Sequence, residues 1–283
     1  ATAGKVHHGG PDDKVGKDIS IPHVSVDSLK FYAKPENIKK GGKRGRSNET
    51  LPWEKAHVSD NAYKDGAMTE RVLEILDSLK GSEEAFYFSV GFYKPHLPFA
   101  APKKYWDLYD RESISLSPCP DEPTKVAKYS VPHYEMASYK GNYNKNGEHV
   151  PDDVAITLRH GYYACVSYID AQVGKIIQKL RELGQYENTV ILLIGDHGFH
   201  LGDQNNWCKH SNFEKATRSP LIIKAPGMKK KNIKTDALVE FVDVYPTLLD
   251  LCRLQKPDYL EGLSLVPLFD DPGRQWKSAA FSQ

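Results

Sequence analysis

The chain has 283 residues, of which 40% are hydrophobic and 27% are charged, and its formal net charge is +1. This composition is ordinary for a globular protein, and a net charge so close to zero gives no support for a nucleic-acid partner. No apolar run approaches the ~20 residues that a membrane-spanning helix needs, so we expect no membrane span.

The four cysteines, Cys119, Cys165, Cys208 and Cys252, are widely spaced and form no C-x-x-C pair. This spacing argues against a zinc cluster and against thioredoxin-like chemistry. Cys165 lies inside a helical pattern and is most simply a small core residue. Two disulfide bridges among the four stay open at this point.

The first part of the chain is polar. Lys5 and His8 lie three positions apart between glycines, in a turn that could present an ammonium and an imidazole to an anion. A solvated loop is the simpler interpretation of this segment alone. Residues 11–60 are irregular and carry a basic run at 39–46. Such runs are usually solvated loops, although this one could contact a polyanionic substrate.

Two later segments have the periodicity of amphipathic helices. From Asp65 onward, apolar residues recur every three to four positions, which predicts a helix that Gly81 ends. Residues 154–183 keep one apolar face for longer and predict a second helix with Gly184 as its C-cap. Between them, residues 100–153 predict a long surface excursion with one short helix near 103–109. Irregular stretches of this length are more often functional than not.

Short apolar runs predict strands at 85–90, 190–194 and 219–225, while residues 239–251 begin like a strand and become a short helix after Pro246. A helix that leads into a buried strand is the repeating unit of a parallel α/β sheet. The run at 190–194 is apolar throughout, which suits a parallel strand covered on both faces. We therefore expect an α/β fold with a mostly parallel central sheet between helical layers.

Polar residues follow two of these strands directly. Asp196 and His197 come just after the strand at 190–194, and at the carboxyl end of a strand both side chains can turn toward one cation. A surface turn in which Asp196 is a cap and His197 is solvated is the alternative. After the strand at 85–90, the sequence 94–98 (K-P-H-L-P) holds a lysine and a histidine on a loop that two prolines stiffen.

Several motifs then follow one another in a fixed order. They are G-K-x-x-H at 4–8, K-P-H-x-P-F at 94–99, G-D-H-G-x-x-L-G at 195–202, W-x-K-x-S-N-F at 207–213, P-L-I at 220–222, A-P-G at 225–227 and V-D-V-Y-P-T-L at 242–248. The ordered set resembles the type I sulfatases of the alkaline phosphatase superfamily, most closely the iduronate-2-sulfatase group and bacterial enzymes like it. The resemblance implies hydrolysis of sulfate esters, with sulfated glycans that contain uronic acid as the expected substrates. It also implies a secreted, periplasmic or lysosomal location.

The resemblance further implies a centre made of a calcium ion and a formylglycine. By position it assigns Asp196 and His197 as metal ligands, Lys5 and His8 as neighbours of the formylglycine and the sulfate, and His96 and Lys209 as contacts of the sulfate group. A histidine ligand is less usual for calcium, so magnesium and manganese stay open. Lysines and a cation suit an ester whose cleavage builds negative charge. His96 is a candidate general acid, with simple sulfate binding an equal alternative, and Lys209 is a candidate sulfate clamp.

The chain departs from the family pattern at the nucleophile. No cysteine or serine stands in a C/S-x-P-x-R motif, and the paired aspartates near the family's N-terminus are missing. We therefore expect residues 1–283 to be a central fragment of a single sulfatase catalytic domain, inactive alone, with the missing N-terminal part of the same enzyme as its partner. Two other functions stay open. One is a phosphodiesterase or phosphonate hydrolase on the same fold, and the other is a sulfated-glycan binder without catalysis.

Overall fold

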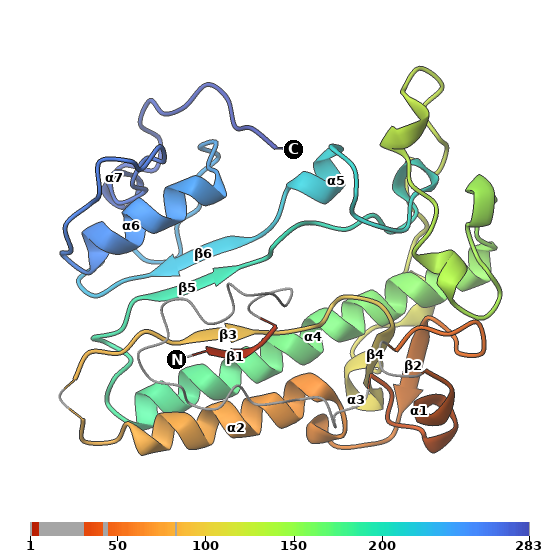
Figure 1. Cartoon of the computed structure of the whole chain (residues 1–283), viewed down its shortest axis with the longest axis horizontal. Helices are drawn as coiled ribbons and strands as arrows, with labels where there is room; N and C mark the ends of the chain where they lie inside the picture. Colours follow the sequence, from red (N-terminus) through yellow and green to blue (C-terminus); the bar gives the residue numbers. More distant parts are fainter. Residues whose placement is uncertain (1, 6–30, 42–44, 83, 283) are drawn as a thin grey trace. The chain divides into compact units, whose positions relative to one another are not determined.

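The computed structural model describes residues 2–5, 31–41, 45–82 and 84–282 (Figure 1). Its contacts form two compact units, the first made of residues 1–183 and 199–211 and the second of residues 184–198 and 212–283. The chain thus leaves the second unit after Gly198, contributes one segment to the first, and returns. The expectation that the whole chain is part of one catalytic domain stays a prediction.

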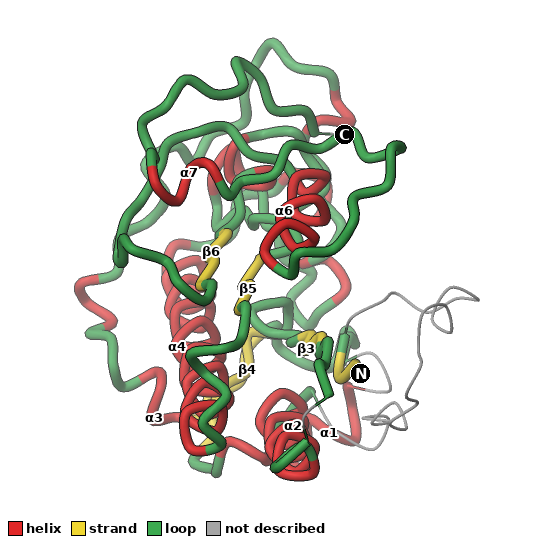
Figure 2. The backbone as a smooth tube through the Cα atoms, turned by 90° about the vertical axis from the view of Figure 1, so that its left-hand side faces the viewer, coloured by secondary structure: helices red, strands yellow, loops and turns green. Residues whose placement is uncertain are grey.

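The first unit combines short strands with helices. In chain order these are β1 (Thr2–Gly4), α1 (Pro35–Gly41), β2 (Trp53–Ala56), α2 (Lys64–Ser78), β3 (Ser89–Gly91), β4 (Phe99–Pro102), α3 (Lys103–Trp106) and α4 (Asp152–Glu182). Turns of 3-10 helix lie at η3 (Asp60–Ala62), η4 (Arg111–Ser113), η5 (Lys128–Ser130), η6 (Met136–Ser138), η7 (Lys145–Gly147) and η8 (Asp203–Asn205). Both long helices predicted from periodicity are therefore confirmed, and they lie side by side in Figures 1 and 2.

The strands of this unit form parallel ladders, which confirms the α/β class. β1 pairs in parallel with β3, and β2 pairs in parallel with β4. Within the described residues these ladders are separate two-stranded sheets, so the pairing is shorter than the continuous sheet expected from the sequence. β3 covers only the end of the strand predicted at 85–90. β2 and β4 lie in stretches whose composition predicted irregular structure.

The core of the first unit forms where α4 packs on β4 and α3. Gly161 of α4 makes this approach close, because a Cβ atom there would lie 2.8 Å from the ring of Trp106 and 2.9 Å from Cβ of Phe99. Leu158 and Ala164 of α4 are fully buried in this core, whereas Val166 of the same helix is 45% exposed. Cys165 is also fully buried, as predicted, and burial raises the pKa of its thiol to about 12.

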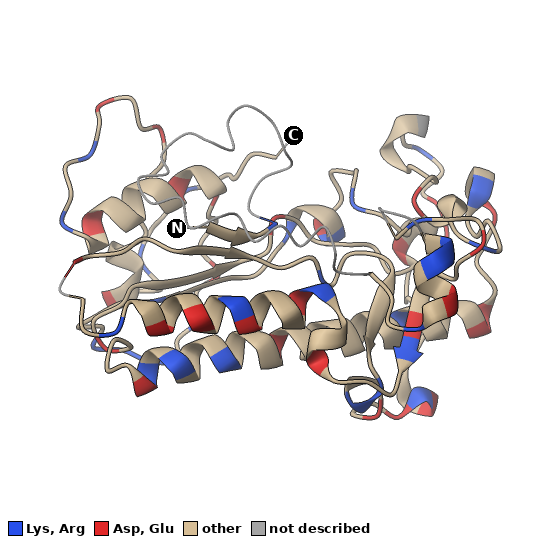
Figure 3. Ribbon diagram, turned by 60° about the horizontal axis from the view of Figure 1, so that its bottom comes forward, with Lys and Arg blue, Asp and Glu red and all other residues tan. Residues whose placement is uncertain are grey.

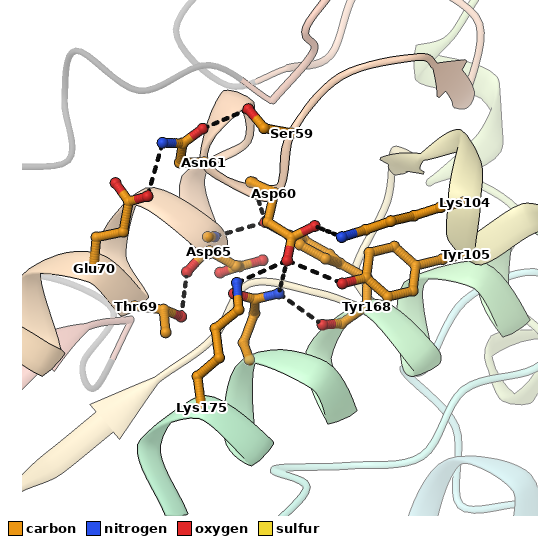
Figure 4. A network of polar contacts seen from close by, with 12 residues as sticks. Ser59, Asp60, Asn61, Asp65, Thr69, Glu70, Lys104, Tyr105, Tyr168 and Lys175 are labelled. Atoms are coloured by element: carbon orange, nitrogen blue, oxygen red, sulfur yellow. Dashed lines mark hydrogen bonds and ion pairs between the residues drawn. The ribbon is translucent and has the colours of Figure 1, made fainter. Parts of the chain in front are cut away.

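Asp60, in η3, links α3 and α4 (Figure 4). Its carboxylate forms ion pairs with Lys104 at 2.8 Å and Lys175 at 2.7 Å. Tyr105 and Gln172 each donate a hydrogen bond to the same carboxylate at 3.0 Å. Burial by itself would raise the pKa of Asp60, but these hydrogen bonds outweigh it and hold the pKa well below its ordinary value. An ionised carboxylate therefore holds these helices in register.

The second unit contains β5 (Ile191–Ile194), α5 (Glu214–Thr217), β6 (Leu221–Lys224), η9 (Phe241–Asp243), α6 (Val244–Leu251) and α7 (Pro267–Asp270). The strands predicted at 190–194 and 219–225 are both present as β5 and β6. The predicted parallel and fully covered state of β5 was wrong. β5 pairs antiparallel with β6, and Ile194 is 46% exposed. An apolar run indicates that a strand tends to be covered, but strand direction depends on the distant segment that returns beside it.

Two further differences concern local structure. The segment at 239–251 has no strand at its start, because Glu240 and Asp243 form a capping box that begins a helical turn. The helix α6 then starts at Val244, ahead of Pro246, because proline is well tolerated in a helix's first turn. All four cysteines carry free thiols, so neither of the disulfides that the sequence left open is formed.

Charged residues of both signs lie along the two long helices, with blue and red positions interspersed (Figure 3). Arg71 and Glu74 pair on α2, and Lys179 of α4 pairs with Asp77 of α2 at 3.0 Å. Within the described residues, no helix is long and apolar enough to cross a membrane.

Candidate active site

The loop between β3 and β4 carries His96, and Asp65 fixes where this loop begins. Both oxygens of the buried Asp65 carboxylate accept backbone hydrogen bonds, from the N–H of Tyr93 at 2.8 Å and from the N–H of Lys94 at 3.0 Å. Burial raises the pKa of Asp65, while these N–H groups and the charge of Lys94 act in the opposite direction. A residue in the first turn of α2 therefore sets the path of the chain out of β3.

Lys94 holds the same loop from inside. Its ammonium donates to the carbonyl oxygen of His96 at 3.1 Å and also to the carbonyl oxygen of Pro98. The Lys94 side chain is buried, and burial lowers its pKa. The sequence placed Lys94 and His96 together on one stiff loop. In the structure the lysine binds the backbone at the histidine and two residues beyond it, so its charge is used within the loop.

The His96 ring is held in one tautomer. Its Nδ1 lies 2.8 Å from the carbonyl oxygen of Leu97, which can only accept, so Nδ1 carries the proton. The other nitrogen, Nε2, is then an acceptor, and it lies 3.1 Å from Nζ of Lys209. Burial, followed by the charge of Lys209, lowers the pKa of His96 to about 3. The ring is therefore neutral at neutral pH.

Lys209 reaches His96 from a distant part of the sequence, on the segment 199–211 that belongs to the first unit. Its ammonium forms an ion pair with Oε1 of Glu135, and the two side chains are 12% and 2% exposed. Nη2 of Arg46, the last residue of the basic run, lies 3.8 Å from the same oxygen. Two cations thus lie beside one buried carboxylate, and one of them, Lys209, also contacts the neutral imidazole.

Lys5 lies at the carboxyl end of the β1–β3 ladder. Its backbone N–H donates to the carbonyl oxygen of Gly91, the last residue of β3, at 2.8 Å. Its charge contributes to the lowered pKa of His96, which is consistent with both residues following strands that end at the same edge. His8, the other residue expected there, lies outside the described residues.

Asp196 and His197 lie in the second unit, directly after β5. Nδ1 of His197 lies 2.6 Å from the carbonyl oxygen of Gly198, so Nδ1 is the donor and Nε2 keeps a free lone pair. Oδ1 of Asp196 lies 3.6 Å from that Nε2. Two atoms about 2.4 Å from one ion and at roughly a right angle are about 3.4 Å apart, so this pair fits two ligands of one cation.

The pair is not a complete metal site. Across the described ranges, no group of three or more His, Cys, Asp or Glu side chains could hold a metal ion together. A divalent cation at Asp196 and His197 would therefore need further ligands in addition to these two. Calcium in proteins usually takes six to eight oxygen ligands.

Comparison with known proteins decides the family. Residues 27–254 match the model of the Sulfatase family. The chain belongs to the sulfatase family. The chain is 31% identical to iduronate 2-sulfatase of Mus musculus over 292 aligned positions, which cover 90% of the chain and 52% of that relative. It is 33% identical to a sulfatase of Formosa agariphila, with 80% of the chain and 43% of that relative covered.

The fold comparison agrees with the α/β class. A phosphonate monoester hydrolase from Silicibacter pomeroyi matches the chain with a TM-score of 0.64 and 26% identity, covering 78% of the chain and 44% of that structure. A phosphonate monoester hydrolase of Agrobacterium radiobacter gives a TM-score of 0.67 at 21% identity, with 83% and 48% covered. The chain spans about half the length of the curated relatives it matches, 52% for the mouse protein.

Two residues of this site were missed by the sequence analysis. Asp65 gave one weak signal, since it is an acidic residue in the first turn of a predicted helix. Such a residue is ordinarily explained by the helix dipole, whereas here it binds the backbone of the next loop. Glu135 gave no signal, because it lies in the irregular stretch at 100–153 and contacts Lys209 across 74 residues of sequence.

Proposed function

We propose that this chain supplies the sulfate-binding groups and two metal ligands of an enzyme that hydrolyses sulfate esters. The observation that supports this most directly is the partly buried pair formed by His96 and Lys209. The ammonium of Lys209, held beside the neutral imidazole, offers a hydrogen-bond donor to an anion in a partly dry environment, where such bonds are stronger than in water. Lys5 and His8 are proposed as further contacts near the sulfate and the nucleophile.

The cofactors of this proposal are a divalent cation and a formylglycine. Asp196 and His197 would hold the cation, which we propose to be calcium, together with ligands from other residues. The cation would stabilise negative charge on the sulfate oxygens. The nucleophile is proposed to be a formylglycine from a segment other than these residues, since no C/S-x-P-x-R motif occurs in the sequence. That segment would be the functional partner of this chain.

The proposed substrates are sulfated glycans that contain uronic acid, in a secreted, periplasmic or lysosomal setting. The similarity to iduronate 2-sulfatase over 90% of the chain supports this choice. A second candidate is hydrolysis of phosphonate monoesters or phosphodiesters, which the similarity to the Silicibacter pomeroyi hydrolase favours. Sulfate monoesters, phosphonate monoesters and phosphodiesters each carry a single negative charge at neutral pH, so charge alone does not separate them.

The test is a direct assay of the full-length protein that contains this chain. Sulfated uronate disaccharides should release inorganic sulfate, measured by ion chromatography, and a nitrophenyl phosphonate monoester should react far more slowly. A higher kcat/KM on the phosphonate ester would favour the second candidate. Binding of the sulfated disaccharide without turnover of either ester would identify a non-catalytic binder.

His96 has two roles open within this proposal. Before the ester binds, Nε2 of His96 accepts a hydrogen bond from Lys209 and the pKa of the ring is about 3, so Nε2 carries no proton to give to a leaving group. A bound sulfate anion would favour the protonated ring, because an opposite charge nearby stabilises the imidazolium. We propose that His96 acts as the general acid only once the ester is bound.

A further inference from the structure

Glu135 is a buried carboxylate whose hydrogen bonding is one-sided. Its side chain is 2% exposed, and Oε1 accepts from the ammonium of Lys209. Arg46 lies 3.8 Å from Oε1, beyond hydrogen-bond distance. Oε2 is buried and has no hydrogen-bond partner within the described residues. A buried carboxylate in this state costs free energy, because one of its oxygens has lost its water without gaining a protein donor.

A second buried carboxylate in the same unit shows the opposite arrangement. Glu54 is also 2% exposed, and both of its oxygens accept hydrogen bonds. Oε1 accepts from the N–H of Ala33 and the hydroxyl of Tyr63, at 2.6 and 2.9 Å. Oε2 accepts from the N–H of Lys34 and from Asn37, at 3.2 and 2.7 Å. Glu54 therefore ties backbone segments together, whereas the hydrogen bonding of Glu135 is directed at one functional side chain.

The contacts of Lys209 indicate what Glu135 does for it. An ammonium has three N–H donors. One is taken by Oε1 of Glu135 and one by Nε2 of His96, which leaves one for a sulfate oxygen. The bond to the neutral imidazole is the weaker of the two, because only its donor is charged, whereas the bond to Glu135 joins two opposite charges and gains their Coulomb attraction as well. Glu135 is thus the main restraint on the position of this long, flexible side chain.

We propose that Glu135 is a positioning residue, which holds Lys209 in place for the sulfate group of the ester. This inference rests on the proposed function, because it assumes that Lys209 contacts the sulfate. The carboxylate also compensates the charge of the buried ammonium in the free enzyme. Sulfate then meets a lysine whose side chain is already ordered, and the entropy of ordering it is not lost on binding.

The experiment uses the full-length enzyme with a sulfated disaccharide as substrate and inorganic sulfate as the binding probe. Glu135→Gln keeps the size of the side chain and removes its charge. We expect kcat/KM to fall roughly 10- to 100-fold, the range seen when residues that orient functional ligands are removed. The loss should appear mainly as a raised KM, with a similar loss of affinity for inorganic sulfate in calorimetry. Glu135→Asp keeps the carboxylate, so it should retain part of the kcat/KM and of the sulfate affinity that Glu135→Gln loses.

A double-mutant cycle distinguishes positioning from general structural damage. In a Lys209→Ala background, Glu135→Gln should change kcat/KM by less than about 3-fold, because the side chain it acts through is gone. Glu54→Gln is the matched control. It should lower the melting temperature but leave the sulfate affinity of the folded protein unchanged.

Three results would overturn the inference. The first is a loss of kcat/KM on Glu135→Gln that is as large in the Lys209→Ala background as in the wild type. The second is an affinity for inorganic sulfate that Glu135→Gln leaves unchanged. The third is a wild-type enzyme that does not bind inorganic sulfate. Failure of the proposed function looks different. The wild type would then bind inorganic sulfate in a Glu135-dependent way but release none from any ester.

Discussion

The two groups of candidate site residues differ in how far the chain itself fixes their geometry. His96 and Lys209 are held by contacts from four segments of the first unit: the α2 start through Asp65, the 94–98 loop, Glu135, and the segment 199–211. Among the described residues, the side chains of Asp196 and His197 contact only each other and the carbonyl of Gly198, and they are 67% and 33% exposed. Their backbone is held on either side, because the N–H of Gly195 donates to the carbonyl of Pro220 at 3.0 Å and the N–H of Gly198 donates to the carbonyl of Ala216 at 2.7 Å.

The difference follows from what each group binds. In an anion-binding site the positively charged side chains repel one another. The protein must therefore supply negative charges and backbone acceptors that hold them in place before the anion binds. A carboxylate and an imidazole that await a cation carry no such positive repulsion, and they can remain solvated until it binds. The first group is thus preorganised by protein contacts, and we expect the second to be organised by its metal ion.

The largest expected effect concerns the metal pair. If a cation organises Asp196 and His197, then Asp196→Ala in the full-length enzyme should cut kcat/KM by ~1,000-fold or more, since a bound cation supplies several kcal/mol of charge stabilisation. Calcium at 100 times its Kd should also stabilise the wild type by about 2.7 kcal/mol, and the variant much less. Melting curves of the wild type and the variant, recorded with calcium and with a chelator, measure this stabilisation by calcium. Asp258→Ala, an exposed aspartate of the same unit, is the control. Full activity after exhaustive chelation would contradict the assignment.

The next effect tests the preorganised group. Lys209→Ala should lower kcat/KM about 100- to 1,000-fold, as removal of one fixed donor from a charge-stabilising site does. The loss should be the same for a sugar sulfate and for nitrophenyl sulfate, because both present the same sulfate group. Lys140→Ala, an exposed lysine in the same unit, should have no effect. A loss smaller than about 10-fold would mean that Lys209 is not a sulfate contact.

A smaller and more selective effect is expected for His96. If the charge of the bound ester raises the pKa of His96 so that the ring takes up a proton from water and acts as the general acid, His96→Ala should slow hydrolysis of a sugar sulfate by ~100-fold or more. Its effect on nitrophenyl sulfate should be much weaker, because that leaving group departs without a proton. Steady-state rates on the two substrates provide the comparison. Equal losses on both would leave His96 as a sulfate-binding residue.

The smallest effect concerns the stability of the first unit, in which Asp60 links α3 and α4. Asp60→Asn should lower the free energy of unfolding by about 2 kcal/mol, the scale of hydrogen bonds to a charged group, discounted for the partly exposed lysines. Because its folded pKa lies below the unfolded value near ~3.9, the contribution of Asp60 is present above that value and is lost as pH falls toward the folded pKa.

Denaturant unfolding between pH 7 and pH 3 provides the measurement for Asp60. Wild type and Asp60→Asn should converge in stability as the pH falls. The control is Asp77→Asn, which removes an ion pair with Lys179 on an exposed surface and should cost no more than about 1 kcal/mol. A difference between wild type and Asp60→Asn that stays constant down to pH 3 would show that the ionised form of Asp60 is not what stabilises the fold.

The sequence by itself determined the parts of this protein that depend on local order. The helices α2 and α4 were predictable because their apolar residues repeat with the helical period over 15 and 31 residues. The family was predictable because its motifs occur in one order along the chain. The candidates Lys5, His96, Asp196, His197 and Lys209 all came from those motifs.

Only the tertiary structure decided the rest, because it depends on contacts between distant residues. Lys209 meets His96 across 113 residues of sequence and Glu135 across 74. No periodicity encodes such a meeting, since the position of each residue follows from the packing of the helices and strands between them. The direction of β5 has the same origin, because an apolar run carries no information about which strand returns beside it. Local patterns therefore identified which side chains matter, and long-range packing decided how they are held.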